Sequence, residues 1–107
     1  MADFNEREKA FEAKFKLDEE LRFKASARRN RLLGVWAAEK MGLNESEADA
    51  YAKEVVKADF EEPGDDDVLQ KVLGDLHGKG IEITDRALRK QMDDLMEVAI
   101  GQIQTEG

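Results

Sequence analysis

Cysteine is absent from this sequence of 107 residues, and proline, histidine, tryptophan and tyrosine each occur once. Without cysteine the chain has no disulfide bond, no thiolate metal site and no cysteine nucleophile, which fits a reducing compartment. Long hydrophobic runs are also missing, because no apolar stretch approaches the roughly 20 residues that span a bilayer. The charged first residues do not have the pattern of a secretory signal. We therefore expect a cytoplasmic protein with no segment inserted into the membrane.

Positive charge is scarce, because 17 Lys and Arg stand against 25 Asp and Glu, for a net charge of −8. Binding to nucleic acid depends mainly on neutralising phosphates with Lys and Arg, so nucleic acid is not expected as a partner. The densest basic cluster is Arg28, Arg29 and Arg31. We interpret it as a solvated helix face whose arginines pair with the many carboxylates, rather than as a nucleic-acid site.

The pattern of residue types predicts an all-α protein. Strand-like alternation is nearly absent, and Ala, Leu, Glu, Lys and Arg dominate long stretches. Four helices are expected, at residues 3–41, from Asn44, from residues 65–67 and from Thr84. Short loops favour antiparallel neighbours and hence a four-helix bundle. We assign residues 1–19 to a mobile N-terminal helical segment and residues 20–107 to the bundle domain.

Capping residues and apolar spacing define the helices of the bundle. Asn44 and Glu47 form a reciprocal capping box, Thr84 is placed as an N-cap, and Gly78 or Gly80 ends the third helix. Apolar residues at intervals of three and four mark the inward faces. In the second to fourth helices these include Ala48, Tyr51, Val55, Val56, Val68, Leu69, Val72, Leu73, Leu76, Leu88, Met92, Leu95, Met96, Ala99 and Ile103. Gly34 costs the first helix about 1 kcal/mol relative to Ala, which the close approach of another helix would justify.

The first helix carries two apolar stripes. At about 100° per residue, Phe4, Phe11 and Phe15 share one stripe. The second stripe, about a quarter turn away, contains Leu17, Leu21, the aliphatic stem of Arg28, Leu32 and Val35. We assign the second stripe to the bundle and the Phe stripe to a partner, with packing of the Phe residues on the bundle itself as the alternative.

The N-terminal segment is therefore the strongest candidate for function. An isolated helix of this length is marginal in water, so we expect it to be mobile when free and helical when its Phe stripe enters a groove. Burial of three Phe rings contributes at most roughly 5–9 kcal/mol, whereas ordering about 15 residues costs on the order of 1–2 kcal/mol each. Polar contacts must therefore support the anchors Phe4, Phe11 and Phe15. The expected rim contacts are Arg7, Lys9, Glu12, Lys14 and Lys16.

Motifs for catalysis, metal binding or cofactor binding are weak. His77 lies at a predicted helix end, where a cation is favourable, and no nucleophile and base pair can be named, so we do not expect an enzyme. The triplet Asp65, Asp66 and Asp67 does not match a calcium loop, whose ligands spread over about 12 residues. The GKG stretch at 78–80 is too short for a P-loop. We assign no catalytic residue, no metal site and no cofactor.

Four stretches, in order along nearly the whole chain, carry a family resemblance. They are FNEREKAFEAKF, DEELRFKASARRNRLLGVWAAEKMG, AYAKEVVKADFEEPGDDDV and VLGDLHGKGIEIT. Together they resemble the zeta subunit of alphaproteobacterial F-type ATP synthases, a natural ATPase inhibitor. The resemblance implies a bundle whose N-terminal segment, residues 1–19, enters a catalytic interface of the head formed by the alpha, beta and gamma subunits. There it would fold and block rotation in the hydrolysis direction, with the protein held at the cytoplasmic side, peripheral to the inner membrane.

A second class of function stays open beside inhibition. Grooves of a helical bundle can hold ligands without a phosphate-binding motif, so the chain could serve as a non-catalytic sensor with weak purine nucleotide binding. The charged first helix lacks a sustained heptad pattern, which favours a monomer when the protein is free.

Overall fold

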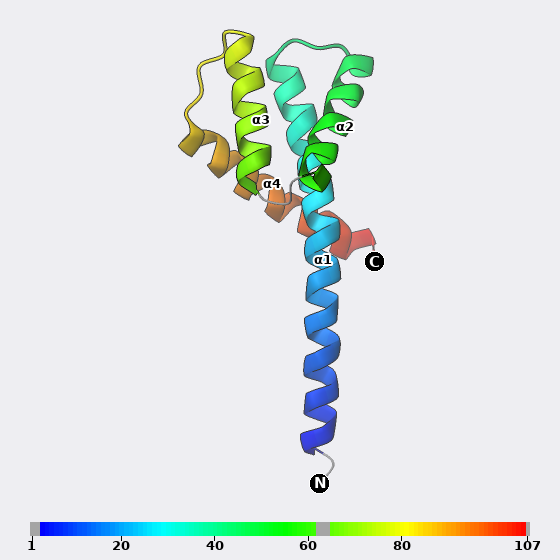
Figure 1. The fold of residues 1–107 in the computed structure, drawn as a ribbon. Coiled ribbons are helices and arrows are strands. Elements are labelled where there is room, and N and C mark those ends of the chain that lie inside the picture. The colour runs from blue at the N-terminus through cyan, green and yellow to red at the C-terminus, as the bar shows by residue number, and fades with distance from the viewer. Residues whose placement is uncertain (1–2, 62–64, 107) are drawn as a thin grey trace.

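The computed structural model describes the backbone of residues 3–61 and 65–106 and the side chains of residues 19–59 and 65–106. Within these residues the fold is all-α, as predicted, and contains no strand. The helices are α1 (Asp3–Lys40), α2 (Glu45–Glu61), α3 (Asp65–Gly78) and α4 (Asp85–Glu106). The molecule is elongated, 64 × 25 × 23 Å, because α1 extends beyond the other three helices (Figure 1).

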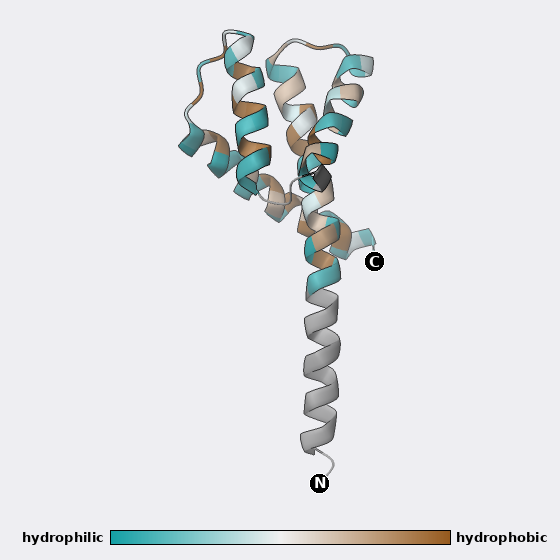
Figure 2. Ribbon diagram, in the orientation of Figure 1, coloured by the Kyte–Doolittle hydropathy of each residue, from teal (hydrophilic) through white to brown (hydrophobic). Residues whose placement is uncertain are grey.

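The bundle forms around the C-terminal part of α1, as the four-helix prediction requires. In Figure 1, α2 runs back along α1, and α4 crosses the group so that the last turns of α4 lie beside α1. Helix α3 contacts each of the other three helices. Hydrophobic residues gather where the helices meet, and hydrophilic residues cover the outer surfaces (Figure 2). Across the described ranges, no helix combines the length and the apolar character that crossing a bilayer requires.

Glycines in the left-handed conformation end α1 and α3. Gly42 has φ 75° and Gly80 has φ 78°, values that L side chains rarely adopt. At both ends the glycine amide and the next amide donate to carbonyl oxygens of the last helical turn, at 3.0–3.1 Å. This pattern is the Schellman motif. Of the two predicted stop residues for α3, Gly80 therefore makes the turn, and Gly78 is the last residue of the helix.

The predicted N-terminal caps of α2 and α4 are confirmed. The Glu47 amide donates to Asn44 Oδ1 at 2.8 Å, and the Asn44 amide donates to Glu47 Oε1 at 3.2 Å. This is the reciprocal capping box expected from the spacing. At α4, the Ala87 amide donates to Thr84 Oγ1 at 3.1 Å. These contacts satisfy amides that have no partner inside their own helix.

The core lies between the C-terminal part of α1 and the facing sides of the other helices. Its buried residues are Leu33, Ala37, Ala38, Tyr51, Val55, Val68, Leu69, Val72, Leu76, Leu88 and Met92. The inward faces predicted for the last three helices supply most of this set. The Tyr51 hydroxyl donates to Asp75 Oδ2 at 2.8 Å across α2 and α3. Burial first, and then this hydrogen bond, raise the pKa of Tyr51.

The inward face predicted for α1 is wrong by about one residue. Leu32 and Val35 are only half-buried, whereas Leu33 is fully buried. Helix α1 contacts α2, α3 and α4, so its buried surface covers a wide arc rather than a single stripe. The fully or almost fully buried positions are Ala25, Arg29, Asn30, Leu33, Gly34, Ala37 and Ala38. Small and charged residues occupy much of this arc, and they contribute little to a hydrophobic pattern.

Gly34 lies at a close approach of α1 and α2. A Cβ atom added at Gly34 would stand 2.5 Å from the Cα of Ala52 and 3.1 Å from its Cβ. Because real Cβ atoms do not approach backbone so closely, only glycine fits this crossing without a shift of the helices. The predicted reason for a glycine inside α1 is confirmed.

Candidate functional site

The residues predicted to bind a partner lie in the first half of α1. They are Phe4, Arg7, Lys9, Phe11, Glu12, Lys14, Phe15 and Lys16. The helix is continuous from Asp3 and crosses the predicted division at residue 19 without a break. The side chains of all eight residues lie outside the described residues. Their role as anchors and rim contacts, and the division of the chain at residue 19, therefore stay predictions.

The helical repeat of α1 relates the N-terminal segment to the bundle. Eighteen residues make about five turns, so positions 11 and 15 have the same register as Arg29 and Leu33. Both of these residues are buried in the bundle. The Phe stripe was predicted to lie about a quarter turn from the inward face, but the corrected inward face is in line with it. One face of α1 therefore runs from the Phe positions directly into the bundle contact.

Three arginines attach α1 to the other three helices near the point where it leaves the bundle. The pairs are Arg28 with Glu106 of α4, Arg29 with Asp65 of α3, and Arg31 with Asp49 of α2. Pairing of this cluster with carboxylates was predicted and is confirmed. The prediction of a solvated face is wrong for Arg29, because its side chain is only 2% exposed. Sequence reasoning missed the distribution of the pairs over three helices. Three arginines within four positions give no sign of which helix each of them contacts.

Arg29 is the buried member of this cluster. Its Nη2 donates to Asp65 Oδ1 at 2.8 Å, and its Nε donates to Asn30 Oδ1 at 2.8 Å. A buried charge is tolerated only when it is paired and hydrogen-bonded. Asp65 lies in the first turn of α3, where a carboxylate also suits the helix dipole. Arg29 therefore fixes α1 against the start of α3.

Arg28 and Glu106 form a bidentate ion pair between α1 and the end of α4. Arg28 Nη2 donates to Glu106 Oε2 at 2.8 Å, and Nη1 contacts Oε1. The hydrogen bond from Arg28 holds the pKa of Glu106 below its usual range. A carboxyl group whose folded pKa is lowered stabilises the fold above its unfolded pKa of about 4.3. That stabilisation is lost as the pH falls through the lower folded pKa.

Replacement of Arg28 by glutamine is expected to raise the pKa of Glu106 back towards the ordinary value of a glutamate, because the charged donor is removed. The measurement is a pH titration of the Glu106 carboxyl carbon by NMR. Lys90→Gln is the control, since Lys90 pairs with Asp94 on α4 and its loss should leave the Glu106 curve unchanged. An unchanged Glu106 pKa in Arg28→Gln would mean that the pair does not persist in solution. Glu106 is exposed and Arg28 is partly exposed, so little change in stability is expected.

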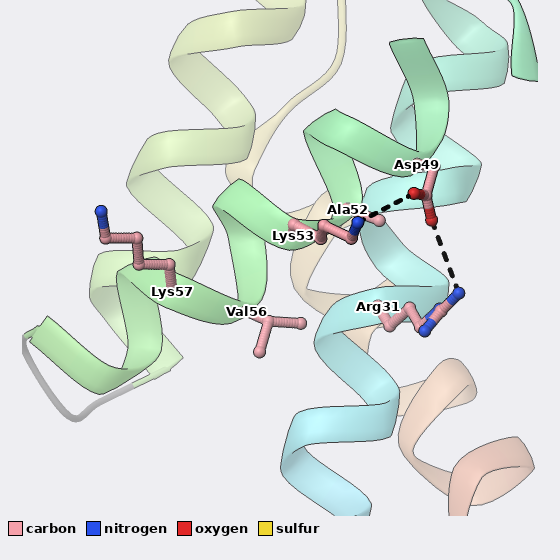
Figure 3. Close-up of a pocket in the computed structure, with 6 residues that line it drawn as sticks. All are labelled: Arg31, Asp49, Ala52, Lys53, Val56 and Lys57. Carbon is pink, nitrogen blue, oxygen red and sulfur yellow. Dashed lines mark ion pairs between the residues drawn. The ribbon is translucent and has the colours of Figure 1, made fainter. Parts of the chain in front are cut away.

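A groove of about 280 Å³ lies between α1 and α2. Its lining residues are Arg31, Asp49, Ala52, Lys53, Val56 and Lys57. Figure 3 shows Arg31 from α1 and Lys53 from α2 converging on Asp49, with Lys57 further along α2. The pairs measure 3.5 Å and 3.2 Å. A nucleotide phosphate in this groove would compete with Asp49 for both bases, so the arrangement fits an ion-pair network better than a phosphate site.

Two members of the acidic triplet at the start of α3 serve as ion-pair partners. Asp65 pairs with Arg29, and Asp66 pairs with Arg89 of α4. In the part of the chain that the structure describes, no group of three His, Cys, Asp or Glu side chains is placed to hold a metal ion. His77 Nε2 lies 2.8 Å from the carbonyl oxygen of Ile83. This contact links the end of α3 to the loop before α4.

Comparisons with known proteins identify a family and a similar solved structure. The family model described as ATPase inhibitor subunit zeta matches residues 1–102. A protein whose structure was determined by solution NMR is 52% identical to this chain, and the match covers 81% of this chain and 99% of that one, with a TM-score of 0.70. Among the curated proteins compared, none matches. The family match includes the whole predicted N-terminal segment.

Proposed function

The chain belongs to the ATPase inhibitor subunit zeta family, and we propose that it inhibits ATP hydrolysis by the F-type ATP synthase through its N-terminal segment. In this proposal residues 1–19 enter a catalytic interface of the head, between the alpha, beta and gamma subunits, as a helix. The inserted helix blocks rotation in the hydrolysis direction. The protein acts as a monomer, without catalysis of its own, and is held at the cytoplasmic side of the inner membrane by the synthase.

The observation that carries the proposal is the shape of α1. This helix has 38 residues, or about 57 Å at 1.5 Å per residue, and its N-terminal part extends beyond the other helices (Figure 1). The ion pairs of Arg28, Arg29 and Arg31 attach the bundle part of α1 to all three neighbouring helices. A helix anchored at one end and projecting at the other can reach into a cleft while the bundle stays outside.

The chemistry of the segment suits a cleft that is apolar inside and polar at its rim. Phe4, Phe11 and Phe15 would fill the apolar part, and each ring contributes roughly 1.5–3 kcal/mol on burial. The charged residues between them would pair with groups at the rim. These are Arg7, Lys9, Glu12, Lys14 and Lys16. Because helix formation is costly for an isolated segment, continuity with the bundle part of α1 lowers the cost of ordering it.

The test measures ATP hydrolysis by a purified alphaproteobacterial ATPase head with the full-length chain and with the variant Phe4→Ala/Phe11→Ala/Phe15→Ala. We expect the full-length chain to inhibit and the variant to lose inhibition. The matched control is Ala2→Ser/Ala10→Ser/Ala13→Ser, which alters the same segment without removing a ring. Circular dichroism must first confirm that both variants are as helical as the parent chain.

Two outcomes would contradict the proposal. No inhibition by the full-length chain would show that this member of the family does not act on the head in this way. Inhibition by the Phe variant at the parent's concentration would show that the Phe residues are not the anchors. In the first case, titration of the isotope-labelled chain with ATP and ADP would test the nucleotide sensor next.

A further inference from the structure

A second hollow lies beside the groove of Figure 3 and continues it along α1. The two share Arg31 and Val56, and the second has a volume of about 600 Å³. It extends from Val56 to Phe23 on α1 and Ile103 on α4. We call the two together the basic groove. It runs along the bundle part of α1, toward the end from which the N-terminal segment projects.

The basic groove is positively charged on a protein with a net charge of −8. The groove is lined by five basic residues and two acidic ones. The basic residues are Lys24, Arg28, Arg31, Lys53 and Lys57, and the acidic residues are Asp49 and Glu106. Its other lining residues are apolar. The groove therefore combines an excess of positive charge with an apolar floor. A solvated helix face would instead carry both signs of charge and would have no groove.

Phe23 lines the basic groove with most of its ring open to solvent. Its side chain is 63% exposed, and the other large hydrophobic residue that is exposed among the described side chains, Val98, reaches 47%. Val98 lies on α4 and does not line the groove. Exposed aromatic rings beside a concave surface are typical of protein interfaces. The structure therefore offers an aromatic residue, an apolar floor and a basic rim at one place.

We propose that the basic groove binds an acidic amphipathic helix of the ATP synthase head, as a second contact beside the N-terminal segment. An amphipathic helix places its apolar side on the floor and its carboxylates against the basic rim. The proposal rests on the proposed function, because insertion of residues 1–19 would bring the adjoining part of α1, on which the groove lies, close to the head. Phe23 lies about two turns beyond Phe15 along the axis of α1, so the two contacts are close together along one helix although they lie on neighbouring faces of it.

A polypeptide fits this groove better than a nucleotide or a nucleic acid does. Asp49 and Glu106 lie among the basic residues. A polypeptide can place its carboxylates beside the basic residues and away from these two, whereas a chain of phosphates carries a negative charge at every unit. The negative charge of the remaining surface opposes nucleic acid, whose binding depends on neutralised phosphates. The apolar floor between the basic residues offers no hydrogen-bond donor or positive charge to a chain of phosphates. These features favour an acidic helix over the other polyanions.

The first experiment compares two charge-reversal triples in full-length protein. The groove triple is Lys24→Glu/Lys53→Glu/Lys57→Glu, and the control triple is Lys79→Glu/Arg86→Glu/Lys90→Glu, which changes the net charge equally. Inhibition of the purified ATPase head is measured at low and high salt. We expect the groove triple to need on the order of tenfold more protein for half-inhibition at low salt, with a smaller difference at high salt. The control triple should stay near the parent chain.

The second experiment compares Phe23→Ala with Val98→Ala in the same assay. We expect Phe23→Ala to weaken inhibition about tenfold and Val98→Ala to have little effect. If the parent chain does not inhibit, the proposed function fails, and this inference fails with it. If the parent inhibits but both groove variants match their controls, only this inference fails. If the groove variants inhibit normally and ATP shifts the amide resonances of Arg31, Lys53 and Lys57 saturably, the groove is a nucleotide site instead.

Discussion

Gly34→Ala is expected to destabilise the bundle by about 1–3 kcal/mol, the usual cost of an overpacked core. Alanine is the better helix former by about 1 kcal/mol, so propensity alone predicts the opposite sign. Packing decides, because the new Cβ would stand 2.5 Å from the Cα of Ala52. That atom belongs to the α2 backbone and cannot rotate away. Either α1 and α2 separate, or the helices bend, and both changes loosen the core around Leu33 and Val55.

The matched control for this substitution is Gly74→Ala on α3. A Cβ at Gly74 would meet nothing within 4 Å, so the same change should stabilise the protein by about 0.5–1 kcal/mol. Chemical denaturation followed by circular dichroism gives both free energies of unfolding. Opposite signs for the two substitutions are the expected result. If Gly34→Ala also stabilises the protein, α1 and α2 are not in close contact at this crossing in solution.

Local signals in the sequence were sufficient to predict the helices of the bundle. Asn44 with Glu47, and Thr84, are caps whose effect depends only on residues three positions apart, and both sets of bonds are present. Gly80 ends α3 for an equally local reason, since its positive φ is easily adopted only by glycine. The clean apolar spacing of α4 also predicted its buried residues Leu88, Met92 and Ala99.

The face of α1 could not be predicted in the same way. This helix packs on three neighbours, so its buried arc includes Ala37, Ala38 and even Asn30, which carry little or no hydrophobic signal. The pattern of larger residues suggested Leu32 and Val35 instead. The basic groove could not be predicted from the sequence for a related reason, because its basic residues come from two separate helices. Lys24 and Lys53 become neighbours of one surface only after α1 and α2 pair.

Loss of Asp65 is expected to destabilise the protein because it leaves the Arg29 charge buried without a carboxylate. Removal of one partner from a fully buried ion pair costs about 3–5 kcal/mol. Asp65 itself is 58% exposed, whereas Arg29 is 2% exposed, so water can partly replace the lost carboxylate. We therefore expect Asp65→Ala to lower the free energy of unfolding by about 2–3 kcal/mol, measured by chemical denaturation.

Asp67→Ala is the matched control, because Asp67 shares the first turn of α3 with Asp65 and interacts with the same helix dipole. Its loss should cost only about 0.3–1 kcal/mol. Equal effects of the two substitutions would mean that Asp65 acts through the dipole and not through Arg29. Arg29→Met separates the remaining alternative, since it removes the buried charge together with its need for a partner. In that background Asp65→Ala should cost no more than Asp67→Ala does.

The position of this pair links bundle stability to the projecting helix. Arg29 has the helical register of Phe11, about five turns earlier on α1, and it is the residue that fixes α1 to α3. If Asp65→Ala loosens this attachment, the N-terminal segment loses part of its fixed direction while its own residues stay unchanged. The variant should then inhibit the ATPase head less well than Asp67→Ala under conditions where both remain folded. Equal inhibition by the two would show that the segment acts independently of how α1 is held.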